Sequence, residues 1–95
     1  MESFEKRISA NLKPITEKLP NGIDLTTSAA VLILLGKKDD QWNLLFTRRT
    51  NGVKTHQGEV SFPGGAWEEG DLTMADTALR ETREEIGVAE ERIKL

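Results

Sequence analysis

With 95 residues, the chain has room for one domain, which we take as residues 1–95, and for only a thin hydrophobic core. A hydrophobic content of 37% and a charged content of 31% are typical of a folded protein rather than a disordered one. The net charge of −3 argues against a general nucleic-acid binder, which would present a basic face. It does not exclude a nucleotide substrate, because a divalent metal can neutralise phosphate groups.

Cysteine and hydropathy narrow the class of protein further. The chain has no cysteine, which excludes disulfide bonds and thiolate metal sites. Its longest apolar run, residues 29–35, is too short to cross a bilayer. The N-terminus lacks the basic-then-apolar pattern of a secretory signal, and its glutamates argue against an organellar transit peptide. We therefore expect a cytoplasmic protein with no membrane partner.

The N-terminal segment is predicted to form a helix followed by a linker, together residues 1–26. Ser3 can cap this helix, because its hydroxyl can accept from a free backbone N–H of the first turn. A spacing of four along residues 3–12 places three apolar side chains on one helical face: Phe4, Ile8 and Leu12.

The middle of the chain is predicted to form strands. Residues 27–35 are predicted to form a strand, because residues 29–35 are a continuous apolar run, typical of a strand that is covered on both faces. A polar loop at 36–40 separates this run from a second strand at 42–49, so the two should form an antiparallel hairpin. Residues 59–62 are expected to add a short strand that ends at 63–65, Pro-Gly-Gly.

The C-terminal third contains a clear helix signal at residues 71–85. Asp71 is a candidate N-cap, and Gly87 suits a left-handed C-terminal cap. Apolar and small residues spaced by three and four define one face: Leu72, Ala75, Leu79, Thr82 and Ile86. Three carboxylates fall away from that stripe: Glu81, Glu84 and Glu85.

These clustered carboxylates suggest a metal site. Like charges on one helix repel each other, although Arg80 and Arg83 relieve some of that repulsion, and a solvated acidic face is the ordinary alternative. The helix is preceded by Gly64 and Gly65, where the backbone can approach a ligand closely. Carboxylates together with a backbone carbonyl suit Mg²⁺ or Mn²⁺.

One motif resembles the Nudix box, which is a glycine followed after a spacer by the segment R-E-U-x-E-E-x-G-U, where U is aliphatic. Here the glycine is Gly65 and the segment is residues 80–88, Arg-Glu-Thr-Arg-Glu-Glu-Ile-Gly-Val. Thr82 stands where an aliphatic residue is usual, and the spacer is one residue longer than in the common box. Leu72 takes the place of a structural glutamate, for which Asp71 is the expected substitute. The resemblance implies an α/β/α sandwich with a mixed sheet, within which the sheet and box would occupy residues 27–88.

A second motif resembles the coenzyme A pyrophosphatases of that family. Residues 45–50, then Lys54, Gly58 and residues 62–65, match the signature L-L-T-x-R-[SA]-x3-R-x3-G-x3-F-P-G-G, with Phe46, Thr50 and Lys54 as departures. This resemblance implies hydrolysis of coenzyme A or its derivatives, a small-molecule nucleotide substrate, to 3′,5′-ADP and 4′-phosphopantetheine. The substrate-binding residues that it implies are Arg49, Lys54, Gly58, Gly64 and Gly65.

The implied reaction is metal-assisted attack of water on a pyrophosphate phosphorus. Glu81 and Glu85 would hold Mg²⁺ or Mn²⁺, helped by Glu84 and a backbone carbonyl near Gly64. Glu84 is also a candidate for the group that orients or deprotonates the attacking water. Arg80 is expected to pair with Asp71 or with a box carboxylate rather than with substrate.

Two alternatives stay open at the level of sequence. One is a Nudix pyrophosphatase for ADP-ribose, a dinucleotide or a nucleoside triphosphate. The other is a catalytically silent fragment that serves as a binding module. Because the Nudix fold continues past the box helix, we also expect residues 1–95 to hold only the N-terminal half of the fold, either as a truncated chain or as a homo-oligomer that completes its sheet.

Overall fold

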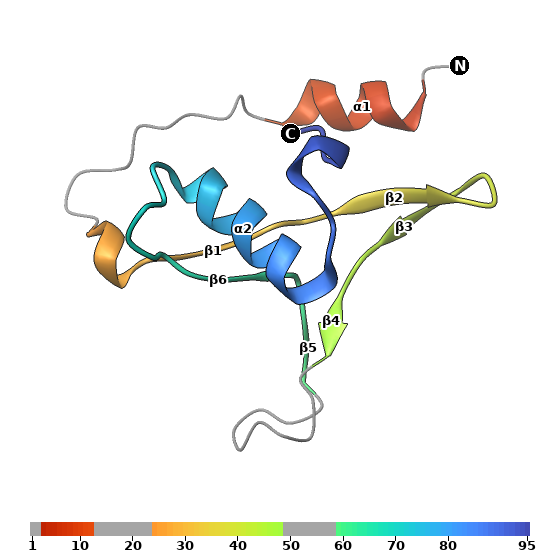
Figure 1. Ribbon diagram of the computed structural model, residues 1–95. Coiled ribbons are helices and arrows are strands. Elements are labelled where there is room, and N and C mark those ends of the chain that lie inside the picture. The colour runs from red at the N-terminus through yellow and green to blue at the C-terminus, as the bar shows by residue number, and fades with distance from the viewer. Residues whose placement is uncertain (1–2, 13–23, 49–58) are drawn as a thin grey trace.

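The computed structural model describes residues 3–12, 24–48 and 59–95 (Figure 1). Two α-helices, α1 (Phe4–Asn11) and α2 (Met74–Ile86), accompany two short 3₁₀ helices, η1 (Leu25–Thr27) and η2 (Glu90–Arg92). The strands are β1 (Ala29–Val31), β2 (Leu35–Lys38), β3 (Gln41–Leu44), β4 (Thr47–Arg48), β5 (Val60–Ser61) and β6 (Gly64–Ala66). The predicted α/β class is therefore confirmed.

Every strand pair in the described part of the chain is antiparallel: β1 with β6, β2 with β3 and β4 with β5. The mixed sheet that the resemblance implies is thus not assembled from these residues. The predicted single strand at 27–35 is instead two strands, β1 and β2, because the chain changes partner between them. Leu32 N–H donates to the Pro63 carbonyl, whereas the Leu34 carbonyl accepts from Leu45 N–H.

The predicted hairpin is confirmed as β2–β3, with Lys38 opposite Gln41. Its turn is shorter than the polar loop expected at 36–40, because only two residues make it. Asp39 and Asp40 both adopt positive φ, 52° and 62°, the backbone of the tight turn that fits the twist of paired strands. The hairpin extends away from α2, as Figure 1 shows.

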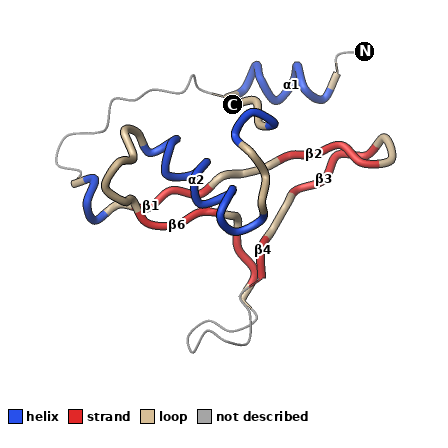
Figure 2. Tube along the Cα trace, in the orientation of Figure 1, coloured by secondary structure: helices blue, strands red, loops and turns tan. Residues whose placement is uncertain are grey.

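Helix α2 lies along one face of β1 and β6 (Figure 2). The buried core between them consists of Leu32, Ala78 and Leu79. Side chains alternate across a strand, so neighbouring residues face the other way. Val31 and Ile33 are 60% and 62% exposed. The expected coverage of this run on both faces is therefore wrong for the described structure, because only one helix packs against it.

The start of α2 also differs from the prediction. Thr73, not Asp71, is the N-cap, and it forms a reciprocal capping box with Asp76. Leu72 therefore precedes the helix and is 83% exposed, so it does not belong to the buried face, whereas Leu79 and Thr82 do. The C-terminal cap is confirmed, since Gly87 has a φ of 71°.

Helix α1 begins as predicted, with the Ser3 hydroxyl accepting from Lys6 N–H. It lies next to the β2–β3 hairpin, where the rings of Phe4 and Trp42 are 5.3 Å apart. No helix in residues 3–12, 24–48 or 59–95 has the length and apolar character needed to span a bilayer.

Candidate active site

A hollow of about 630 Å³ opens between β4–β5, β6 and the C-terminal half of α2. Its lining combines a cation, two carboxylates, two glycines and an aromatic ring: Arg48, Glu81, Glu85, Gly64, Gly65 and Phe46. The hollow thus brings together residues that are far apart in sequence, and four of them are site residues predicted from the sequence.

The two glycines fill different roles in shaping this hollow. A Cβ at Gly64 would collide with the carbonyl oxygen of Ala30 and the backbone of Val31, because β6 lies directly against β1. A Cβ at Gly65 would instead lie 2.5 Å from Cδ of Glu81 and 2.7 Å from its Oε2. Gly64 therefore permits the pairing of β6 with β1. Because Gly65 has no side chain, the Glu81 carboxylate can lie against β6.

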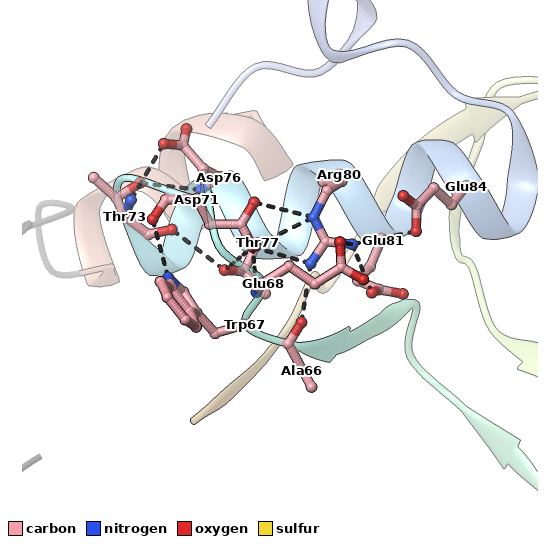
Figure 3. A network of polar contacts seen from close by, with 10 residues as sticks. All are labelled: Ala66, Trp67, Glu68, Asp71, Thr73, Asp76, Thr77, Arg80, Glu81 and Glu84. Carbon is pink, nitrogen blue, oxygen red and sulfur yellow. Dashed lines mark hydrogen bonds and ion pairs between the residues drawn. The ribbon is translucent and has the colours of Figure 1, made fainter. Parts of the chain in front are cut away.

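Arg80 connects the helix to the loop and the strand (Figure 3). Its Nε and Nη2 donate to Asp71 Oδ1 and Oδ2 at 3.0 and 2.9 Å, and Nη2 also donates to the Ala66 carbonyl at 2.9 Å. Its Nη1 donates to Glu81 Oε1 at 2.8 Å and to Glu84 Oε2 at 3.2 Å. The predicted pairing of Arg80 with Asp71 and a box carboxylate is confirmed, and it fixes the carboxylate of Glu81 beside Gly65.

Asp71 is held by neighbours that the sequence analysis missed. Its Oδ2 accepts from Glu68 N–H at 3.0 Å and from the Thr77 hydroxyl at 2.9 Å, while its carbonyl accepts from the Trp67 indole at 3.0 Å. The pKa of Asp71 lies well below its ordinary range. The main cause is the hydrogen bond from the Arg80 guanidinium, and the next is the hydrogen bond from the Glu68 N–H. The contact between Arg80 and Asp71 raises the pKa of Arg80 further. The spacing of Thr77 and Arg80 on one helix face was the available signal for this cluster.

The three predicted metal-ligating glutamates do not occupy equivalent places. Glu81 and Glu85 both line the hollow, and the Glu81 side chain is only 18% exposed. Glu84 does not line it, since its carboxylate turns to Arg80 and is 49% exposed. Among the described residues, no three acidic or histidine side chains are grouped so that they would hold a metal ion. The geometry thus assembles two of the three expected ligands.

Two carboxylates one helical turn apart, beside a half-buried glycine backbone, still provide the hard oxygen donors that Mg²⁺ and Mn²⁺ prefer. The donor chemistry fits a divalent ion that also takes ligands from a phosphate group. Arg49, Lys54 and Gly58, predicted to bind substrate, lie outside the described residues. Arg48, next to them in sequence, is described and lines the hollow.

Comparison with known proteins identifies the family of the chain. The NUDIX domain family model matches residues 25–95. Nudix hydrolase 3 of Caenorhabditis elegans is 38% identical over 94 residues, covering 99% of this chain and 39% of that protein. The uncharacterized Nudix hydrolase NudL of Pectobacterium atrosepticum is 42% identical over 92 residues, covering 97% of this chain and 43% of that protein.

A mitochondrial coenzyme A diphosphatase of Homo sapiens is 48% identical over 63 residues, covering 65% of this chain and 27% of that protein. The chain therefore spans less than half the length of these relatives. The family model covers the strands, the glycine pair and the whole box helix, which are the parts that build the hollow. The chain belongs to the Nudix family.

Proposed function

We propose that this chain carries the catalytic helix of a divalent-metal-dependent pyrophosphohydrolase. The observation that supports this most strongly is the contact of the Glu81 carboxylate with Gly65, in a hollow that Glu85 and Arg48 also line. Hydrolysis of a pyrophosphate needs groups that concentrate positive charge on the phosphate oxygens. This hollow offers one guanidinium directly and two carboxylates that can recruit a divalent cation.

Each described residue has a distinct task in this proposal. Glu81 and Glu85 would hold Mg²⁺ or Mn²⁺, which when bound offsets the charge of the phosphates and polarises the phosphorus. Arg80 keeps the Glu81 carboxylate in one orientation through its 2.8 Å contact, while Asp71 and Ala66 keep Arg80 in place. Glu84 faces Arg80, and its role as the group that orients water stays a prediction.

Coenzyme A is the substrate that we propose, cleaved to 3′,5′-ADP and 4′-phosphopantetheine in the cytoplasm. Two observations support it: the coenzyme A pyrophosphatase signature across residues 45–65, and the 48% identity to a coenzyme A diphosphatase. ADP-ribose and dinucleotides share the pyrophosphate but lack the additional 3′-phosphate. Arg49 and Lys54, together with Arg48, would supply cations for that extra charge.

The decisive assay is turnover with Mg²⁺ or Mn²⁺ across coenzyme A, ADP-ribose and nucleoside triphosphates, with products separated by chromatography. We expect coenzyme A to give the highest kcat/KM, with 3′,5′-ADP as one product. A preference for ADP-ribose or a triphosphate would overturn the substrate assignment. Absence of turnover with all of them, in folded protein, would favour a silent binding module.

Two matched variants test whether any activity depends on the hollow. Glu85→Gln removes a carboxylate from the lining while keeping its size, so we expect at least a 100-fold loss of kcat, of the order seen when transition-state charge stabilisation is removed. Glu90→Gln makes the same change on η2, away from the hollow, and should leave kcat unchanged. Equal activity in both variants would exclude a catalytic role for Glu85.

A further inference from the structure

An aromatic stack lies beside the hollow, and one of its two rings belongs to a residue of the lining. The rings of Phe46 and Phe62 are 4.8 Å apart with an interplanar angle of 25°, which is a stacked arrangement. Phe46 lines the hollow and is 50% exposed, whereas Phe62 does not line it and is only partly exposed. Phe62 therefore stacks on one face of the Phe46 ring, while Phe46 stays half-exposed and contributes to the lining of the hollow.

The half-exposed ring of Phe46 has a polar setting that leaves it accessible to a ligand. Phe46 lies next to polar and charged lining residues rather than within the hydrophobic core of Leu32, Ala78 and Leu79. The other aromatic pair, Phe4 and Trp42, sits beside α1 and does not border this hollow. Phe46 is thus the described aromatic side chain that shares a hollow with Glu81 and Glu85.

Arg48 stands in the same lining, two residues further along the chain. No ion pair links it to another described residue, in contrast to Arg80, which contacts four carboxylates. A guanidinium that is not committed to a carboxylate can bind phosphate through two parallel N–H groups. The hollow therefore presents an aromatic ring and a guanidinium without an ion pair to any other described residue, next to two carboxylates.

We propose that Phe46 and Arg48 form a nucleotide-recognition pair, in which the base stacks on Phe46 and a phosphate binds Arg48. Stacking suits a planar base because every base has a π-face, and the fixed backing by Phe62 keeps the platform in place. The inference rests on the proposed function for the position of the pyrophosphate beside Glu81 and Glu85. It adds that Phe46 determines the preference for a nucleoside over a bare diphosphate.

Two non-hydrolysable probes separate the base from the phosphates: α,β-methylene-ADP and methylenediphosphonate, titrated calorimetrically with Mg²⁺ present. We expect the native chain to bind α,β-methylene-ADP more tightly. Phe46→Leu should weaken that binding about tenfold, the loss of one base–aromatic stack, and leave methylenediphosphonate within about twofold. Phe46→Trp, which restores a flat ring, should retain the affinity for α,β-methylene-ADP.

Control variants make each result specific. Phe4→Leu changes the aromatic pair outside the hollow in the same way and should alter neither affinity. Arg48→Gln should weaken both probes by a similar factor, about fivefold or more, because both carry the phosphate mimic. Arg83→Gln, an exposed arginine outside the lining, should weaken neither.

The proposal is overturned if Phe46→Leu binds α,β-methylene-ADP as tightly as the native chain, or if it weakens both probes equally. It is also overturned if the native chain shows no preference for the nucleotide. Because neither probe is hydrolysed, these results are independent of turnover. Base-dependent binding without coenzyme A hydrolysis would contradict the proposed function alone, and hydrolysis without a Phe46 effect would contradict this inference alone.

Discussion

Two regions of the chain are organised differently. In the described part of the chain, α2, β1, β6 and the segments next to them contain the buried residues and the hydrogen-bond network centred on Arg80 and Asp71. Among the described strand pairs, the β2–β3 hairpin has the longest antiparallel ladder, yet all four residues of β2 are exposed. The candidate active site belongs to the first region. Its glutamates are positioned by tertiary packing, whereas the hairpin is held mainly by its own backbone pairing.

The largest contrast in stability should come from matched leucine truncations. Leu79 is 5% exposed and packs in the core, so Leu79→Ala should lower the free energy of unfolding by about 2–5 kcal/mol through lost burial and a cavity. Leu44→Ala in β3 removes a half-exposed side chain and should cost about 1 kcal/mol or less. Urea unfolding measures both. Equal losses would show that the hairpin contributes as much packing as α2.

Alanine substitutions at two glycines test the same difference in packing between the α2 region and the hairpin. Gly64→Ala places a methyl group against the Ala30 carbonyl and Val31, so β1 and β6 must separate, at a cost of about 1–3 kcal/mol. Gly36→Ala, within β2, meets no heavy atom within 4 Å and should change stability by no more than about 0.5 kcal/mol. Thermal unfolding measures both variants. A destabilised Gly36→Ala variant would contradict the open environment of the hairpin.

Gly65→Ala should affect the site more than the fold. Its new methyl group meets the end of a side chain, the Glu81 carboxylate, rather than backbone, so the carboxylate can move aside. We expect stability to fall less than in Gly64→Ala, while kcat/KM falls about 10- to 100-fold because Glu81 is misplaced. Turnover and unfolding measured on the same samples decide this. Full activity would mean that the contact of Glu81 with Gly65 has no catalytic importance.

The smallest predicted effect is a pH dependence of stability at acid pH. The pKa of Asp71 is lowered in the folded chain below its ordinary value of 3.8, chiefly by Arg80. Its stabilising contribution is therefore fully present above that value and is lost as the pH falls through the lowered pKa. Asp71→Asn should flatten this part of the stability profile, and Glu90→Gln, in the 3₁₀ helix η2, which contains no buried residue, serves as the control. An unchanged profile in Asp71→Asn would contradict a charged contact with Arg80.

Much of the local structure could be predicted from the sequence, because short-range signals determine it. The Ser3 and Gly87 caps, the β2–β3 hairpin and the pairing of Arg80 with Asp71 follow from residue type and spacing. The exchange of partners between β1 and β2 could not be predicted, since it depends on where β6 lies. Periodicity alone gave no reason to stop the strand at Val31.

The site, too, could be predicted where short-range signals determine it and not where tertiary contacts do. The box motif identified the three glutamates, and residue spacing placed them on one side of the helix. Residue spacing did not distinguish Glu84, which does not line the hollow, from Glu81 and Glu85, which do. Thr73, not Asp71, is the N-cap, and the Asp71 carboxylate instead accepts hydrogen bonds from Arg80, Glu68 and Thr77, contacts that depend on how the loop folds onto α2.

The central claim is that the hollow beside Gly65, lined by Glu81 and Glu85, binds the divalent ion. Electron paramagnetic resonance titration with Mn²⁺ tests it without any substrate. Glu81→Gln and Glu85→Gln should each weaken Mn²⁺ binding at least about tenfold, whereas Glu84→Gln should stay within about threefold and Glu90→Gln should match the native chain. Native Mn²⁺ affinity in the Glu81 and Glu85 variants, or an equally large loss in Glu84→Gln, would contradict the account.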